Sequence, residues 1–464
     1  MPRVEGSREI YVAPEGKPDA VGSRAAPLDI VTVFTKPGAV MPGDVVWFQS
    51  GEYKPGPIEQ NPRVCGTKER PIIFRAAPGL PAEAGVPAKE GQRATIESNL
   101  TINGSYTWLW GLELTGQGKN FGVDVRGGDG VKLINLVVHD NATPMKPGEK
   151  KRETGQGVNG WDVGNDHEYY GNLSYRNGTI DWSHCIYVQN TAAHSTKYCT
   201  DNIVFDSFGY GFHVFGESPT LKGIVLEGNI VFGAVGGSNI LAGGMKPISD
   251  LVLRNNCTYN LEGWGKASYG VNVAYNPKVG AHDILIEGNY FAGNKFALGA
   301  RGISHNLTVR RNTFWAWGDT VEVLHPPDAT RRNLAWDDNT YIGNGKFDLA
   351  AWQKQTGFDA HSTLVDGMAG KPTGLHVVKR VNKYEPSRVH LAVYNWDHHP
   401  SVKINVSDIA PPGTKYRIVN VLDLYGKPVA EGIVSGGTIE LPMSGHQFEP
   451  EFGAYLLFRE ATGN

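Results

Sequence analysis

The stretch VLEGNIVFGA (residues 225–234) decides the fold, because its plan recurs along the chain. A short strand of alternating apolar residues is followed by an Asn and then by a second short strand. The plan returns in LVLRNNCTYN (251–260) and ILIEGNYFAG (284–293). Apolar spacing of two indicates β-strands, whereas helical repeats show spacings of three and four. The recurring Asn residues are Asn135, Asn172, Asn202, Asn229, Asn256, Asn289, Asn312 and Asn339.

The spacing of these Asn residues predicts a solenoid. From Asn172 onward they follow one another at intervals of 23 to 33 residues. A period in the twenties with variable insertions is typical of stacked coils, and each coil needs its neighbours to bury its apolar face. We expect each Asn to occupy a left-handed corner and to bond the equivalent amide one coil away.

Two segments near the start of the chain carry a family resemblance. PGDVVWFQSGEY (42–53) and GTKERPIIFRAAPG (66–79) resemble the opening coils of chondroitinase B, the related alginate lyases and other pectate-lyase-like proteins. The resemblance implies an all-β fold, with a right-handed parallel β-helix over residues 8–345. It implies no single reaction, because this superfamily hosts lyases, hydrolases, epimerases and non-catalytic adhesins.

The pattern changes after residue 345. FDLAAWQKQTGFDAHS (347–362) predicts a short helix within a linker spanning residues 346–385. From Arg388 onward, alternating strands are separated by turns, which predicts a β-sandwich over residues 386–462. This part resembles the small sandwich attached to many glycan-degrading enzymes.

Composition excludes several classes of protein. The 464 residues include 44 basic and 47 acidic side chains, so the chain has no electrostatic footprint for nucleic acid. No apolar run is long enough for membrane insertion, and the N-terminus has no signal-peptide core. We expect a secreted or periplasmic protein whose signal peptide is absent from this sequence, with a cytoplasmic location as the alternative. The four cysteines have neither metal-site spacing nor a disulfide framework.

A second type of strand alternates with the Asn strands, as in HCIYVQN (184–190) and YGFHVFG (210–216). We align these strands on the small residue that opens each one, so that an apolar residue points inward and the next residue points outward. Equivalent residues of successive coils lie about 4.8 Å apart. The predicted outward row is Asp124, Asp162, Tyr187, His213, Ile240, Asn272 and Glu322.

This row predicts the functional face. A solubility row prefers Thr, Ser, Lys and Glu, whereas carboxyl, phenol and imidazole groups carry out acid–base chemistry. The predicted catalytic residues are Asp124, Asp162, Tyr187, His184 and His213. The predicted substrate-binding residues are Arg126, Gln189, Asp181, Glu217, Asn272 and Trp182. A long insertion beside this face carries Lys146, Lys150, Lys151 and Arg152.

The same segment resembles polygalacturonases. The matching stretches are VNGWD (158–162), SHCI (183–186) and GYG (209–211). Asn159 replaces the first aspartate of that family, Ser183-His184 replaces its pair of aspartates, and Tyr210 replaces its histidine. Only Asp162 matches an acidic position, so the resemblance implies where the site lies and not how it works.

We therefore expect an enzyme that cleaves a polysaccharide or oligosaccharide, and three functions stay open. In the first, hydrolysis uses Asp124 and Asp162 on adjacent coils, with carboxyls about 5 Å apart as in a retaining pair. In the second, a lyase eliminates across a uronate, with Tyr187 as acid and His213 or His184 as base. The third is a non-catalytic glycan-binding or adhesin solenoid. No cofactor is required, although calcium held by Asp124 and Asp162 is an option for the lyase.

Overall fold

The computed structural model consists of two compact units, residues 2–77 with 94–370 and residues 78–93 with 371–464. Among the described residues, no helix has the length and apolar character needed to span a bilayer. The basic residues predicted beside the functional face, Lys146, Lys150, Lys151 and Arg152, lie outside the described residues. The structure describes residues 6–77, 93–117, 121–142, 155–323, 332–365 and 372–460.

Three parallel sheets form the first unit, which confirms the predicted parallel β-helix. Sheet A contains β1 (Glu9–Val12), β2 (Val45–Phe48), β5 (Ile72–Ala76), β8 (Thr107–Trp110), β11 (Lys132–Ile134), β14 (Glu168–Tyr170), β17 (Lys197–Thr200), β20 (Leu221–Glu227), β23 (Ile248–Arg254), β26 (Ala281–Glu287), β29 (Ile303–Arg310) and β32 (Arg332–Asp337). Sheet B contains β3 (Gly51–Tyr53), β6 (Ala94–Glu97), β9 (Glu113–Gln117), β12 (Val137–Ala142), β15 (Leu173–Tyr175), β18 (Ile203–Phe205), β21 (Ile230–Phe232), β24 (Cys257–Tyr259), β27 (Tyr290–Ala292), β30 (Thr313–Trp315), β33 (Thr340–Ile342) and β34 (Thr363–Val365). Sheet C contains β4 (Ile58–Glu59), β7 (Leu100–Ile102), β10 (Phe121–Val125), β13 (Gln156–Gly160), β16 (His184–Val188), β19 (Tyr210–Gly216), β22 (Ile240–Gly244), β25 (Tyr269–Val273), β28 (Phe296–Ala300) and β31 (Thr320–Val323).

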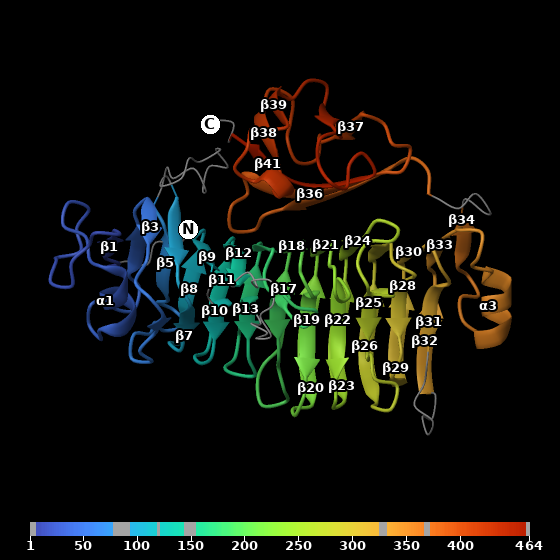
Figure 1. Ribbon diagram of the computed structural model, residues 1–464, viewed down its shortest axis with the longest axis horizontal. Helices are drawn as coiled ribbons and strands as arrows, with labels where there is room; N and C mark the ends of the chain where they lie inside the picture. Colours follow the sequence, from blue (N-terminus) through green and yellow to red (C-terminus); the bar gives the residue numbers. More distant parts are fainter. Residues whose placement is uncertain are drawn as a thin grey trace, which may run out of the picture. The chain divides into compact units, whose positions relative to one another are not determined.

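Each coil passes through sheet A, then sheet B, then sheet C, and the coils follow one another from blue to orange in Figure 1. Parallel connections of this kind are right-handed almost without exception. Inward side chains of successive coils stack in register and form the core. In sheet C, for example, Val158, Ile186, Phe212 and Ile240 are all buried.

A continuous ladder of buried Asn side chains follows the corner between sheets A and B. The Nδ2 of Asn172 donates to the Oδ1 of Asn202 at 2.9 Å, and Asn202 repeats the bond to Asn229 at 2.9 Å. The series ends at Asn339, whose Nδ2 donates to the Oδ1 of Asp359 at 3.1 Å. The predicted amide contact between coils is therefore confirmed.

The left-handed conformation at this corner belongs to the residue before each ladder Asn. Gly228, which precedes Asn229, has φ of 69°. The predicted left-handed conformation is therefore wrong for the ladder Asn residues from Asn172 onward, and it holds only for Asn135, which has φ of 51° and occupies this preceding position. Leu136 stands in the ladder position, and its backbone N–H donates to the Oδ1 of Asn172 at 2.9 Å. Two adjacent residues thus share the roles that the sequence pattern assigned to one.

The solenoid extends past the predicted boundary at residue 345. Helix α3 (Leu349–Thr356) begins at the N-cap Asp348, and β34 then adds a twelfth strand to sheet B. Another short helix, α1 (Ile30–Thr35), lies between β1 and β2.

The C-terminal unit is a small antiparallel sandwich. Its first strand, β35, begins inside the segment predicted as a linker. Val393, Ile404 and Leu441 contribute to one apolar core shared by its two sheets. None of the four cysteines, all of which lie among the described residues, forms a disulfide. The larger sheet contains β35 (Leu375–Val381), β36 (Arg388–Asn395), β41 (Phe452–Arg459), β38 (Lys415–Asn420) and β39 (Ala430–Ile433), the smaller contains β37 (Ser401–Asn405) and β40 (Thr438–Pro442), and η1 (Val421–Asp423) follows β38.

Replacing one ladder amide tests how much the corner stabilises the solenoid. Asn229 bonds Asn202, Asn256 and the carbonyl of Cys199, so Asn229→Ala leaves several buried groups without partners. We expect its free energy of unfolding to fall by ~3 kcal/mol in denaturant titration. Asn276→Ala, which removes one exposed turn hydrogen bond, is the control. Equal losses in the two variants would contradict a structural role for the ladder.

Candidate functional site

The strand register on the outer face of sheet C corrects the predicted row. Asp124 pairs with Asn159, Asn159 with Tyr187, and Tyr187 with His213. The row then continues through Leu241, Asn272, Gly299 and Glu322. Asp124, Tyr187, His213, Asn272 and Glu322 are therefore placed as predicted, whereas the placement of Asp162 and Ile240 in this row is wrong.

The misalignment of Asp162 has a simple cause. Two glycines, Gly157 and Gly160, lie three residues apart in this strand, and the alignment took Gly160 as the opening residue. In the structure Val158 is the partner of Val123, so the strand is shifted by three residues. Trp161, predicted to point inward, instead packs against Tyr187 on the outer face at a ring-centroid distance of 5.3 Å.

Asp124 is buried and fully engaged. Its Oδ2 accepts from the Nε of Arg126 at 2.5 Å, and its Oδ1 accepts from the indole N–H of Trp161 at 2.5 Å. The exposed Arg126 guanidinium also lies 5.3 Å from the centroid of the Trp161 ring. This carboxylate holds its neighbours in position and has no free oxygen directed at solvent.

The centre of the face is a cluster of imidazole and phenol rings. His184 lies 4.9 Å from Tyr187 and 5.4 Å from His213, measured between ring centroids. The two imidazoles also approach through their Nδ1 atoms at 3.4 Å. His184 Nε2 contacts the Oδ1 of Asn159 at 3.2 Å. Tyr210 stacks on His213 at 4.4 Å.

Both imidazoles are neutral near pH 7. Burial lowers the pKa of His184 to about 3. Burial and the neighbouring His184 lower the pKa of His213 well below its ordinary value. A neutral imidazole carries a lone pair that can accept a proton, and the lowered pKa makes each ring a weaker base than an exposed histidine.

Tyr187 is positioned by its neighbour Gln189. The Gln189 Nε2 donates to the Tyr187 hydroxyl at 2.5 Å, and that hydroxyl donates to the carbonyl of Phe215 at 2.9 Å. Burial raises the pKa of Tyr187 to about 12, which keeps the phenol protonated. The phenol is therefore protonated beside two neutral imidazoles, with its hydrogen directed at the Phe215 carbonyl.

The predicted rim residues are exposed and lie beside the cluster in sequence. Trp182 is 66% exposed and directly precedes Ser183 and His184. Asp181 forms an exposed ion pair with Lys266 at 3.3 Å. Glu217 is exposed directly after β19.

Sequence reasoning did not name several aromatic residues of this face as site residues. The Tyr210 ring stacks on the His213 ring with centroids 4.4 Å apart, and the Phe215 ring is tilted against it with centroids 4.8 Å apart. Trp161 forms part of the same surface. These aromatic residues flank the outward row in the sequence, but only the correct strand register shows that they lie on the same surface. With them, the face alternates aromatic platforms and polar groups along successive coils.

A second constellation lies further along the face. The Tyr269 hydroxyl bonds Glu322, and the Nε of Arg301 lies 3.2 Å from a carboxylate oxygen of Glu322. Asn272 lies two coils from His213 in the row and is buried.

A calcium site at Asp124 and Asp162 does not fit these contacts. Both oxygens of Asp124 accept short hydrogen bonds, and Asp162 lies outside its row. Calcium takes six to eight oxygen ligands, which this arrangement does not offer. The same register removes the adjacent pair of carboxylates that the hydrolytic mechanism requires.

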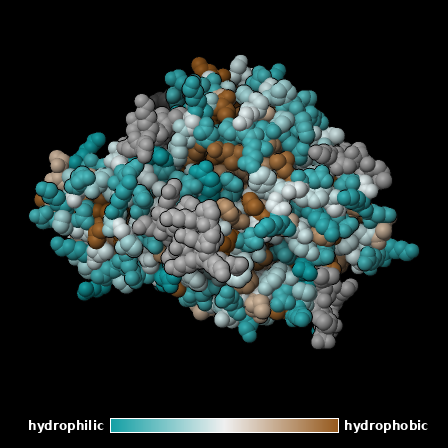
Figure 2. Space-filling view, in the orientation of Figure 1, coloured by the Kyte–Doolittle hydropathy of each residue, from teal (hydrophilic) through white to brown (hydrophobic). Residues whose placement is uncertain are grey.

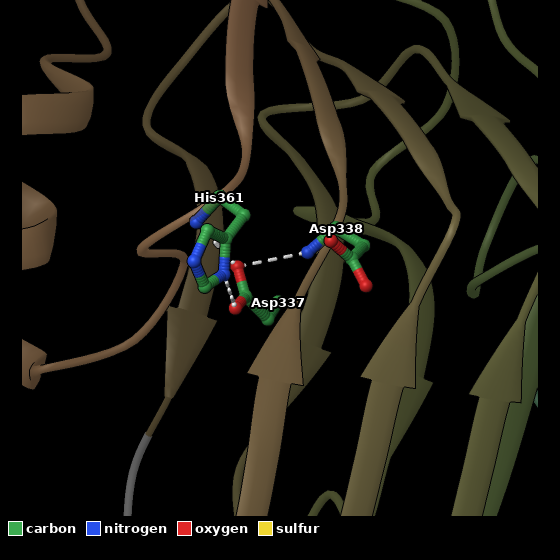
Figure 3. A group of neighbouring side chains, drawn as sticks. All are labelled: Asp337, Asp338 and His361. Carbon is green, nitrogen blue, oxygen red and sulfur yellow. Dashed lines mark hydrogen bonds and ion pairs between the residues drawn. The ribbon is translucent and has the colours of Figure 1, made fainter.

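Asp337, Asp338 and His361 form the one group of at least three metal-binding side chains found among the described residues. Figure 3 shows the Asp337 carboxylate turned toward the His361 ring, and their Oδ2 and Nδ1 atoms lie 2.6 Å apart. Asp337 also accepts hydrogen bonds from the backbone N–H groups of Asp338 and His361. The cluster is thus an exposed, internally satisfied ion pair at the end of β32.

A surface groove lies elsewhere, on the outer face of sheet A. A shallow groove of about 740 Å³ there has a largely apolar floor that includes Tyr198, Val225, Val252 and Leu285. This floor offers little chemistry. Figure 2 shows a surface that is mostly hydrophilic, with hydrophobic residues in small separate groups. The acid–base groups described above gather on sheet C.

Comparison with known proteins gives one similar sequence. A pectate disaccharide-lyase of Dickeya chrysanthemi is 30% identical over 152 residues, which is 30% of this chain and 20% of that protein. The chain thus matches about a fifth of the relative's length. No family model matches the chain.

Several solved structures overlap partly with this chain at low sequence identity. An alginate lyase from Paenibacillus sp. str. FPU-7 overlaps at a TM-score of 0.39 with 16% identity, covering 70% of this chain and 98% of that one. A rhamnogalacturonan lyase overlaps at 0.42 with 14% identity, covering 71% and 87%. The gp49 tailspike of Acinetobacter baumannii bacteriophage Fri1, a capsular polysaccharide depolymerase, overlaps at 0.39 with 10% identity, covering 89% and 78%. The β-helix assignment rests on the chain's own three sheets.

The buried neutral His184 makes the stability of the protein depend on pH. Its pKa is about 3 in the folded protein and 6.5 ordinarily, so the unfolded chain binds more protons between these values. Its contribution to the free energy of unfolding is complete above pH 6.5 and falls by roughly 1.4 kcal/mol for each pH unit below it.

We expect His184→Gln to show a shallower pH dependence than the wild type in denaturant titrations at pH 7, 6 and 5. Identical slopes for the two proteins would show that His184 is not buried in its neutral form.

Proposed function

We propose that this protein is a polysaccharide lyase whose outer sheet C face binds an acidic glycan and cleaves it by elimination. The observation that carries this proposal is the register of the row: Asn159, not a second carboxylate, lies beside Asp124. The neutral His184–His213 pair and the protonated Tyr187 follow on the next two coils. Hydrolysis by two adjacent aspartates is disfavoured, because this row places Asn159 and not a second aspartate beside Asp124.

The chemistry of elimination matches these groups. A base removes the proton at C5 of a uronate, the C4–O bond breaks, and an acid protonates the departing oxygen while a C4–C5 double bond forms. We assign the base to His213, because it is only half-buried, whereas His184 is buried and contacts Asn159. We assign the acid to Tyr187. Gln189 orients that phenol through its amide.

The aromatic residues support binding of a chain rather than of a single sugar. Trp161, Tyr210, Phe215 and Tyr275 are partly exposed and are spread over several coils of the same face. Successive coils are spaced by about 4.8 Å, so a glycan lying along the solenoid meets a new coil at short intervals. Arg126, which is exposed, adds a positive charge at one end.

The similarity to the pectate disaccharide-lyase favours a polyuronate as substrate. Polymers of this kind lie outside cells, so a secreted or periplasmic location accompanies the proposal. Neither nucleic acid nor a cofactor enters it.

The reaction class is tested by incubating the protein with polygalacturonate, alginate, chondroitin sulfate and neutral glycans. We expect new reducing ends together with the ultraviolet absorbance of an unsaturated uronate. Reducing ends without that absorbance would establish hydrolysis. Binding without any cleavage would establish a non-catalytic solenoid.

Removing the Tyr187 hydroxyl tests the assignment of the acid. Tyr187→Phe keeps the ring contacts and removes the hydroxyl together with its bonds to Gln189 and Phe215, so we expect kcat to fall by about a hundredfold. Tyr198→Phe, on the exposed face of sheet A, is the matched control and should retain full activity. Full activity in Tyr187→Phe would place the acid elsewhere.

A further inference from the structure

Lys197 stands at the start of an aliphatic column in the core, directly after the buried His167 of the preceding coil. Lys197 pairs in register with Ile224, and the column continues through Leu251 and Ile284. Leu307 follows in the next coil. These four neighbours are buried aliphatic residues, and Lys197 itself is only 1% exposed. The packing of the solenoid therefore accepts an aliphatic side chain at this position in several successive coils, and it has no need of a lysine.

The ammonium of Lys197 is bonded to the strand ends of the candidate site. Its Nζ donates to the carbonyl of Trp161 at 2.5 Å and to the carbonyl of Gln189 at 2.9 Å. These two residues leave sheet C on adjacent coils, directly after β13 and β16. Lys197 thus ties together two coils at the point where the chain leaves the functional face.

Both tied residues contact groups of the proposed reaction. The Trp161 indole donates to Asp124, and the Gln189 amide donates to the hydroxyl of Tyr187. A shift of the Trp161 backbone would move its indole ring, and a shift of the Gln189 backbone would move the Tyr187 phenol. An error of about 1 Å in the position of a catalytic group can lower the rate a hundredfold.

Burial and the neighbouring charged groups set the protonation state of Lys197. Burial lowers its pKa to about 8, so it is mostly charged at neutral pH. Asp162 and the Cys199 thiol act in the opposite direction. The Oδ1 of Asp162 is buried without a hydrogen-bond partner, with His194 Nε2 at 3.8 Å. His167, one coil earlier, stays neutral because burial and the Lys197 charge lower its pKa to about 4.

We propose that Lys197 is a positioning residue, which fixes Trp161 and Gln189 from beneath the face and through them orients Tyr187. This role gives Asp162, placed outside the outward row, a purpose as the acidic neighbour of a buried ammonium. The kinetic test of this inference rests on the proposed function. The structural test rests only on the contacts of Lys197.

The test uses the full chain with Lys197→Met and Lys197→Gln, and Lys222→Met as control. Lys222 lies on the next coil, is exposed, and pairs with Asp250. We expect both Lys197 variants to fold, since aliphatic residues fill the equivalent positions. On the polyuronate that the wild type cleaves, kcat should fall at least about tenfold. Lys222→Met should retain wild-type kcat.

A double-mutant cycle separates positioning from general loss of structure. If Lys197 acts through Tyr187, adding Lys197→Met to Tyr187→Phe should lower kcat by less than about twofold further. Multiplicative losses, or an active Lys197→Met, would overturn the proposal.

A crystal structure of Lys197→Gln supplies a readout that needs no substrate. We expect the Gln189 amide to leave the Tyr187 hydroxyl and the Trp161 indole to leave Asp124. Unmoved Trp161 and Gln189 would overturn the inference even if the enzyme is a lyase. If the wild type cleaves no glycan while these shifts are observed, the proposed reaction fails and the positioning role stands.

Discussion

The ladder of Asn amides at the corner between sheets A and B is the interaction on which the rest of the structure depends. Each amide bonds the next coil and a backbone carbonyl at the same time, as Asn229 does with Asn256 and Cys199. Buried polar groups of a tight corner are costly unless all are paired. The Asn side chains of the ladder form the hydrogen bonds that these buried groups require. The same bonds hold successive coils in one register.

That register decides what the outer face can do. Because the corner repeats without slippage from Asn172 to Asn339, residues that share a position in the coil share a row on the surface. Tyr187 and His213 become neighbours for this reason, although 26 residues separate them in the chain. The same rule excludes Asp162 from the row, and with it the hydrolytic pair.

The site also depends on groups beneath the face. The column of sheet A continues from position 197 through buried aliphatic residues, but the chain places an ammonium there. Burying a charge is unfavourable unless it is paired, and removing its partners costs more than the pair contributes. Such an exception to the apolar pattern is expected where function constrains the core, which agrees with the positioning role proposed for Lys197. In this protein Lys197 contacts the backbone directly after β13 and β16, at Trp161 and Gln189.

The sequence by itself determined the solenoid and its period, and it placed the candidate acid–base residues on one face, because alternation and a repeated corner residue are local patterns. It also identified Tyr187, His184 and His213, whose strands have a single plausible alignment. Tertiary structure alone decided that Asn159 replaces Asp162 beside Asp124 and that Asn135 lies outside the ladder. It alone decided that Lys197 reaches two carbonyls of the neighbouring sheet. The physical reason is that two glycines three residues apart, or two adjacent corner residues, fit the same local pattern. Only the hydrogen bonds between coils select one of them.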